Sequence, residues 1–269
     1  MITRPVGCVL VLLLACQPAY ADPWDWGDRI RGEGPVREER RPVRGIEAVE
    51  LGTTGTLFIE QGDSVTLTLV AEENLLEYLE TDVRGGMLTI RARKRVNLSP
   101  SEPIEYHLTL PSLDELILSS SGDAELSDWK AERLLIELES SGDLDCGALV
   151  CPQLDVTLES SGDMTVASWE GDLLRARLSS SGDLKIRGGK ARELDLRLSS
   201  SGDFQAADLE CKEASVHTSS SGDAVLHVTE YLEARTSSSG DVVFYGDPQV
   251  DAHASSSGDV VHRGPRDRS

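Results

Sequence analysis

The 269-residue sequence is poor in aromatic side chains, which make up only 4% of the chain. Stacking platforms for sugars or bases are built from aromatic rings, so their scarcity argues against a site of that kind. Basic residues are also in deficit, because 26 Lys and Arg face 47 Asp and Glu and leave a formal net charge of −21. A chain this acidic is a poor candidate for binding nucleic acid or an anionic membrane.

Motifs that carry catalytic chemistry are equally scarce. The five His are scattered, and the sequence has no zinc-ligand spacing, nucleophile elbow or metal triad. A catalytic site needs distinct acids or bases gathered on one patch, whereas this chain repeats the same residues along its length. We therefore expect a protein that is not an enzyme, and keep a polysaccharide-acting β-helix enzyme as the alternative of a different class.

Residues 1–21 have the pattern of an export signal. Arg4 precedes an apolar run from Val6 to Ala15, and the small-residue pattern Ala19-Tyr20-Ala21 follows. The run is too short to span a membrane and predicts a cleaved secretory signal peptide. The stretch "LLLAC" also resembles a bacterial lipobox, in which Cys16 would become the lipidated first residue. Both alternatives predict export to the periplasm or cell surface, the second as a lipoprotein anchored in the outer membrane, with that anchor as the protein's contact with the membrane.

Residues 22–45 are rich in Pro, Gly and charge and show no apolar period. This composition predicts a flexible tether. The alternative is an N-terminal arm that packs on the domain through Trp24 and Trp26. At the other end, residues 263–269 form a polar tail that could end the folded domain.

The motif Ser-Ser-Gly-Asp occurs eight times at nearly fixed intervals, five of 20 residues and then two of 18. Self-similarity at this period is the signature of a solenoid, in which each coil buries its apolar face by stacking on its neighbours. The repeats and the region before them define one domain over residues 46–262. The glycines of the motif are Gly122, Gly142, Gly162, Gly182, Gly202, Gly222, Gly240 and Gly258.

Apolar residues alternate with polar ones on both sides of each motif. They stand two and four residues after the Gly, and four, six and eight residues before the next one, as Leu194, Leu196 and Leu198 show. This period of two indicates short strands with one buried face and excludes helices. We predict an all-β, right-handed parallel β-helix of about eight coils of 18–20 residues, preceded by an N-terminal β region of the same domain. The 18-residue coils would lose two residues from the connector that carries Trp129 and Trp169.

Within the corner itself, the alternation places the Gly inward and the Asp outward. The Gly would supply backbone angles closed to other residues, and the Asp would accept a hydrogen bond from a nearby turn amide. On this interpretation the motif is a repeated corner.

The region upstream of the repeats contains "GIEAVELGTTGTLFIEQGD" and "VRGGMLTI", followed by "LTLPSLDELILSSSGD". This arrangement resembles the head GIN domain of auto-transporter adhesins, a family of exported bacterial proteins, over roughly residues 45–262. The resemblance implies a parallel β-helix-like solenoid with an adhesion or scaffold role at the cell envelope. It supplies no catalytic residues.

The aspartates of the motif form a column down the stack. Unit charges about 5 Å apart repel by about 1 kcal/mol even in water, so the column needs compensation. Turn hydrogen bonds could supply it, and the residues favour this reading because the bidentate Glu of calcium loops is missing. The alternative is a calcium ladder, with calcium as the cofactor of a structural rod. The column comprises Asp123, Asp143, Asp163, Asp183, Asp203, Asp223, Asp241 and Asp259.

A basic column stands five residues before the glycines of the later coils. It could dock an anionic polymer such as a surface polysaccharide, so the expected partner is an envelope or surface glycan or a protein. The alternative, which the residues favour, is that Asp195, Glu233 and Asp251 on the same face neutralise it. The column comprises Arg177, Arg197, His217, Arg235 and His253.

Three cysteines lie beyond the leader. Cys151 and Cys211 occupy the same coil position about 14 Å apart, too far for a disulfide, which leaves Cys146 with Cys151 as the candidate pair. The last coil of a solenoid also exposes a strand edge prone to pairing with another chain, so a homo-oligomer, joined end to end or side by side, is a further expectation.

Overall fold

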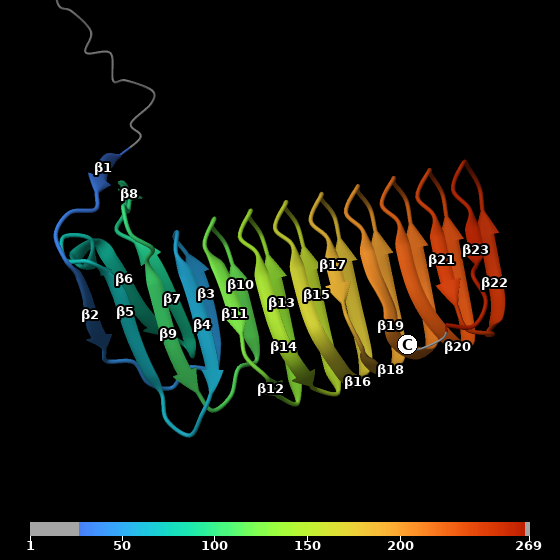
Figure 1. The fold of residues 1–269 in the computed structure, drawn as a ribbon, viewed down its shortest axis with the longest axis horizontal. Coiled ribbons are helices and arrows are strands. Elements are labelled where there is room, and N and C mark those ends of the chain that lie inside the picture. The colour runs from blue at the N-terminus through green and yellow to red at the C-terminus, as the bar shows by residue number, and fades with distance from the viewer. Residues whose placement is uncertain (1–26, 267–269) are drawn as a thin grey trace, which may run out of the picture.

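The computed structural model describes residues 27–266, which form a rod built almost wholly of strands (Figure 1). The leader with Cys16, and Trp24 and Trp26 of the N-terminal segment, lie outside the described residues. No helix in the described part of the chain is long and apolar enough to cross a membrane. The strands before the first repeat, with one 3₁₀ turn, are β1 (Asp28–Arg31), β2 (Val36–Arg41), β3 (Ala48–Gly52), β4 (Thr56–Gln61), β5 (Thr66–Glu72), η1 (Leu76–Tyr78), β6 (Leu79–Arg84), β7 (Met87–Ala92), β8 (Val96–Ser99) and β9 (Glu105–Leu110).

The strands of the repeats stack into two parallel ladders. One ladder runs from β3 through β10, β13 and β15 to β22, and the other runs from β4 through β11 and β14 to β21 and β23. The strands of this region are β10 (Glu115–Leu118), β11 (Asp123–Leu126), β12 (Trp129–Lys130), β13 (Arg133–Leu138), β14 (Leu144–Val150), β15 (Gln153–Leu158), β16 (Met164–Leu178), β17 (Leu184–Ile186), β18 (Gly189–Leu198), β19 (Phe204–Thr218), β20 (Ala224–Thr236), β21 (Val242–Tyr245), β22 (Gln249–Ala254) and β23 (Val260–His262). The prediction of a parallel β-solenoid is confirmed.

The core follows the predicted alternation. Leu194, Leu196 and Leu198 are all buried, and Phe204 is fully enclosed between the two ladders. The connectors add a short third ladder that the two-strand prediction did not contain, in which Trp129 pairs with Leu149. Strands such as β16 and β19 therefore run unbroken around the connector for 15 residues.

The shortening to 18 residues falls in this connector, as predicted. Between β19 and β20 the register shifts after Ala206 and again after Cys211, while the residues on both sides keep their columns.

Glycine is required at the corners for a different reason from the one that the sequence predicts. None of the eight has a positive φ, whereas Gly189 and Gly246 in the connectors do. A Cβ on Gly182 would lie 2.1 Å from the carbonyl oxygen of Gly162, and the later corners repeat this contact at 2.1 to 2.3 Å. Gly is therefore required because successive corners stack with their backbones in contact, and not because the corner has unusual backbone angles.

The flexible tether predicted over residues 22–45 is wrong for the part that the structure describes. β2 pairs antiparallel with β5, with Val36 opposite Glu72 and Arg41 opposite Leu67, and β1 pairs parallel with β8. β2 lacks an apolar period because five of its six residues are exposed at the edge of the sheet. Charged side chains at an edge block further strand pairing, so they do not indicate disorder here.

The N-terminal end of the stack is closed by antiparallel strands. β5 pairs antiparallel with β9 and β6 pairs antiparallel with β7, so each parallel ladder ends in a hairpin-like cover. The buried carboxylate of Glu72 fastens this cover, because its Oε1 accepts the backbone N–H groups of Ser101 at 2.9 Å and Glu102 at 3.2 Å.

The C-terminal end is open. Among the described strands, β22 pairs only with β20 and β23 only with β21. The polar tail first continues the last coil, where the backbone N–H of Gly246 bonds to the carbonyl of Gly264. Arg266 then reaches back to the carboxylate of Asp208 at 2.8 and 2.9 Å. The tail thus turns back along the side of the rod, and the last strands form its far end in Figure 1.

Candidate binding surface

The outward aspartates form a continuous hydrogen-bond ladder. The backbone N–H of Asp183 donates to Oδ1 of Asp163 in the preceding coil at 2.8 Å, and every later corner repeats the contact at 2.8 Å. The same bond joins Asp143 to Asp123 at 3.0 Å and Asp163 to Asp143 at 2.9 Å. Seven of the eight carboxylates, all except that of Asp259 in the last described coil, therefore accept an amide proton from a residue 18 or 20 positions away.

This geometry gives the aspartates the corner role that the sequence favoured. A carboxylate that accepts a backbone N–H is stabilised in its charged form, which offsets repulsion along the column. The donor is an amide of the next coil and not one of the same turn. Within residues 27–266, no group of three or more His, Cys, Asp or Glu side chains is arranged to hold a metal ion.

The basic column is continuous in the structure. Arg177 pairs in register with Arg197, which pairs with His217, and the same ladder continues through Arg235 to His253. Five residues at the strand spacing cover about 19 Å of the rod's length. The sequence-predicted stripe is therefore one surface feature, defined here as the basic stripe.

Neutralisation affects only part of the basic stripe. Arg197 lies 3.6 Å from Asp195, and Arg235 lies 2.7 Å from Glu233, which also raises the pKa of Arg235 through a hydrogen bond and through its charge. Arg177, His217 and His253 have no ion pair among the described residues. Carboxylates on the same face therefore neutralise two of the five residues of the basic stripe, Arg197 and Arg235.

A second stripe of serines runs beside the basic one, and sequence reasoning missed it. The hydroxyl of Ser179 donates to the carbonyl of Leu158, and the hydroxyl of Ser199 donates to that of Leu178 in the same way. With its proton used inward, such a hydroxyl still offers an acceptor outward. A shallow groove of about 450 Å³ follows the two stripes and is lined by Arg177, Arg197, His217, Ser179, Ser199 and Ser219.

Toward the N-terminal end, the column of positions that forms the basic stripe carries negative charge instead of positive charge. Glu137 occupies the basic column two coils before Arg177, with Thr157 between them. Burial raises the pKa of Glu137, and the charges of Glu115, Glu139 and Glu159 raise it further. The face is therefore acidic over the first coils and basic over the later ones.

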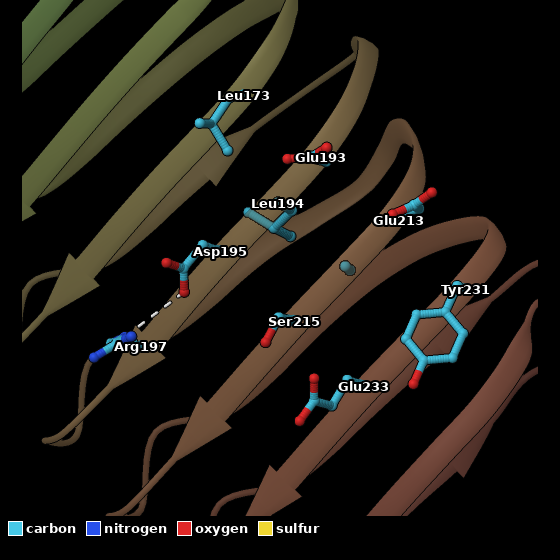
Figure 2. A pocket seen from close by; sticks show the side chains of 10 residues that line it. Leu173, Glu193, Leu194, Asp195, Arg197, Glu213, Ser215, Tyr231 and Glu233 are labelled. Carbon is cyan, nitrogen blue, oxygen red and sulfur yellow. Dashed lines mark ion pairs between the residues drawn. The ribbon is translucent and has the colours of Figure 1, made fainter.

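Carboxylates gather in a second shallow groove of about 360 Å³ on the same face (Figure 2). Glu193, Asp195, Glu213 and Glu233 line it, with Tyr231 at one end. Asp195 and Glu233 are held in the ion pairs with the basic stripe, and Glu193 bonds to Arg192. Figure 2 shows these side chains spread over successive strands and not converging on one point.

The predicted disulfide between Cys146 and Cys151 is wrong. Cys146, Cys151 and Cys211 are all free and buried, and burial raises the pKa of each thiol, that of Cys211 to about 12. Cys146 lies within β14 and Cys151 just after its end, and each thiol packs into the core without bonding to the other. Cys151 instead accepts a hydrogen bond from the indole N–H of Trp169 at 3.3 Å.

The fold and its surface define a class of protein: a parallel β-solenoid that displays repeated columns of side chains over shallow grooves. Residues 46–248 match the model of the family described as "Putative auto-transporter adhesin, head GIN domain". The chain belongs to this family, as its resemblance at the level of sequence motifs predicted.

Three solved structures of similar fold come from two Parabacteroides species. A "putative adhesin" from Parabacteroides distasonis is 21% identical with a TM-score of 0.80, covering 87% of this chain and 100% of its own. A "putative adhesin" from Parabacteroides merdae is 20% identical with a TM-score of 0.78, covering 87% and 99%. A "Putative lipid binding protein" from P. distasonis is 23% identical with a TM-score of 0.76, with the same coverage. A comparison with curated proteins finds no match. At these identities the structures show the shared fold.

Proposed function

We propose that this protein is an exported, non-catalytic adhesion protein of the cell envelope, and that its basic stripe binds an anionic surface polymer such as an acidic polysaccharide. Membership of the adhesin family and the β-solenoid fold support an adhesion-like role. The observation that carries the ligand class is the unbroken register of the basic stripe over a groove of about 450 Å³.

A polymer with regularly spaced negative charges suits such a surface. The stripe repeats its charge at the strand spacing of about 4.8 Å, so several charges of one extended polymer can be engaged together. Arg177 and His217 lack ion-pair partners among the described residues, so they can bind without first breaking an ion pair. The serine stripe offers acceptors for sugar hydroxyls along the same line.

The alternative of a polysaccharide-acting enzyme has less support. Glycoside hydrolysis needs two carboxyl groups facing each other across a bound sugar. The acidic groove of Figure 2 is open, and three of its four carboxylates are held by arginines. Family members and structural neighbours are described as adhesins or as a lipid-binding protein.

Binding of the chain from residue 22 onward to dextran sulfate, with neutral dextran beside it, tests this function. We expect Arg177→Glu combined with His217→Glu to weaken binding at least about tenfold, and added salt to weaken it further. Arg187→Glu is the matched control, because Arg187 is an exposed base that directly follows β17 of the other ladder. Equal binding by the double variant and the control, or equal binding to neutral dextran, would refute the proposal.

A further inference from the structure

The open C-terminal end of the rod carries an unpaired strand edge. All six residues of β22 are exposed, and Val250, which continues a buried column of the core, is 41% exposed. The backbone N–H of Ser255 donates to Thr236 in the preceding coil. Because backbone groups alternate in direction along a strand, Val250, Ala252 and Ala254 point theirs away from the stack.

This edge lacks most of the sequence features that prevent an exposed strand from pairing with another chain. The opposite edge, β2, reads Val-Arg-Glu-Glu-Arg-Arg, a charged sequence that resists pairing. β22 reads Gln-Val-Asp-Ala-His-Ala and has no Lys, Pro or bulge. Since antiparallel strands close the N-terminal end, a second copy cannot stack head to tail on the open end.

We infer that the open end pairs with the same end of a second copy of this chain, with the two β22 strands antiparallel about a two-fold axis at Ala252. In this register Ala252 faces its own copy, and Val250 faces Ala254 of the partner subunit. These are the residues whose backbone groups point outward, so about six backbone hydrogen bonds can form. The register also continues the apolar core columns across the junction.

Charge supports the same register. Asp251 and His253 point outward, because they pair with Glu233 and Arg235 of the preceding coil. Centring the pair on Ala252 places Asp251 opposite His253 of the partner subunit, at the closer, non-hydrogen-bonded positions of an antiparallel ladder. Centring on Asp251 would keep the backbone groups of Val250 and Ala252 facing the partner, but it would place two aspartates directly opposite each other, so charge disfavours that register. The dimer would be a rod of double length with two basic stripes.

Sedimentation of the chain from residue 22 onward, which retains every described residue, tests the inference. The contact is smaller than a standard interface of about 1,600 Å², so concentrations up to about 1 mM are needed. We expect a shift from monomer to dimer mass, lost in Ala252→Pro, which removes an outward N–H on an edge strand where Pro is tolerated. A chain that stays monomeric, a dimer unaffected by Ala252→Pro, or assemblies larger than a dimer would overturn it.

A charge exchange separates this register from other pairings. His253→Asp would place like charges opposite each other and weaken association at least tenfold, and adding Asp251→His would restore it. Arg187→Asp is the control for an added negative charge on an interior coil, and it should associate like the parent. Melting curves of each variant show that the fold is retained. If the double exchange fails to restore the dimer while the variants remain folded, this register is wrong.

Discussion

The two ends of this rod are built from the same kind of strand but finished in opposite ways. At the N-terminal end, β2, β5 and β6 turn antiparallel and cover the stack, and the outermost strand is heavily charged. At the C-terminal end the ladders stop with β22 and β23, and the tail turns aside to Asp208. A solenoid needs a cap only where it must not associate, so the difference locates the end available for pairing.

The largest expected contrast is between an interior corner and the last one. Gly182→Ala would place a Cβ 2.1 Å from the carbonyl oxygen of Gly162, between coils that cannot separate. We expect a loss of about 3 kcal/mol or more in the free energy of unfolding, measured by urea denaturation. Gly258→Ala meets a similar contact at 2.3 Å but lies in the last coil, which can move outward. An equal loss at both positions would show that the open end is as rigid as the interior.

Shortening a buried core side chain should give the next largest loss of stability. Leu196→Ala in the middle of the rod and Leu69→Ala in β5 of the N-terminal cover remove fully buried side chains, so each should cost about 2–5 kcal/mol. Val250→Ala, at a side chain 41% exposed, should cost less than about 1 kcal/mol in dilute monomer. The same denaturation curves measure all three. A small loss at Leu69 would mean that the N-terminal cover contributes little to the core.

The aspartate ladder predicts a smaller contrast. Asp163→Ala removes the acceptor for the N–H of Asp183 and should cost about 1 kcal/mol. Asp163→Asn keeps an acceptor oxygen and removes a charge, so it should be near neutral. Asp259→Ala should change stability by less than about 0.5 kcal/mol, because no later coil in residues 27–266 donates to it. Equal losses for Asp163→Ala and Asp259→Ala would contradict the ladder as the source of the effect.

The smallest expected effect is that of calcium. The carboxylates already accept amide protons, so millimolar calcium or a chelator should leave the melting temperature unchanged. A ligand specific to the folded state raises that temperature, so a clear rise that Asp183→Asn abolishes would support the calcium ladder instead.

The repeated part of the fold could be predicted because its signal is local. Alternation around each Gly identifies inward residues such as Leu196, and the connector was correctly named as the site of shortening. Contacts between coils could not be read in this way. The Gly was assigned to special backbone angles, whereas its cause is a carbonyl oxygen 18 or 20 residues away. The partner of each Asp is equally remote in sequence.

The sequence did not predict the N-terminal cover or the serine stripe, and the reasons differ. β2 has no apolar face, because five of its six residues are exposed, so only its pairing with β5 reveals it as a strand. The serines at 179, 199, 219, 237 and 255 do show a regular spacing, three residues before each Gly. This spacing runs beside the basic stripe, but it does not stand out in the sequence, because Ser is common throughout the corner.

Hydrogen exchange of the backbone amides, measured at several protein concentrations, tests the contrast between the two ends most directly. We expect the amides of Val250, Ala252 and Ala254, which point away from the stack, to exchange fast in dilute solution and to become protected as concentration rises. Residues 66–72 of β5, which pair with strands on both sides, should be protected throughout. Fast exchange of the amides of Val250, Ala252 and Ala254 at every concentration, or protection already complete in dilute monomer, would contradict the inference.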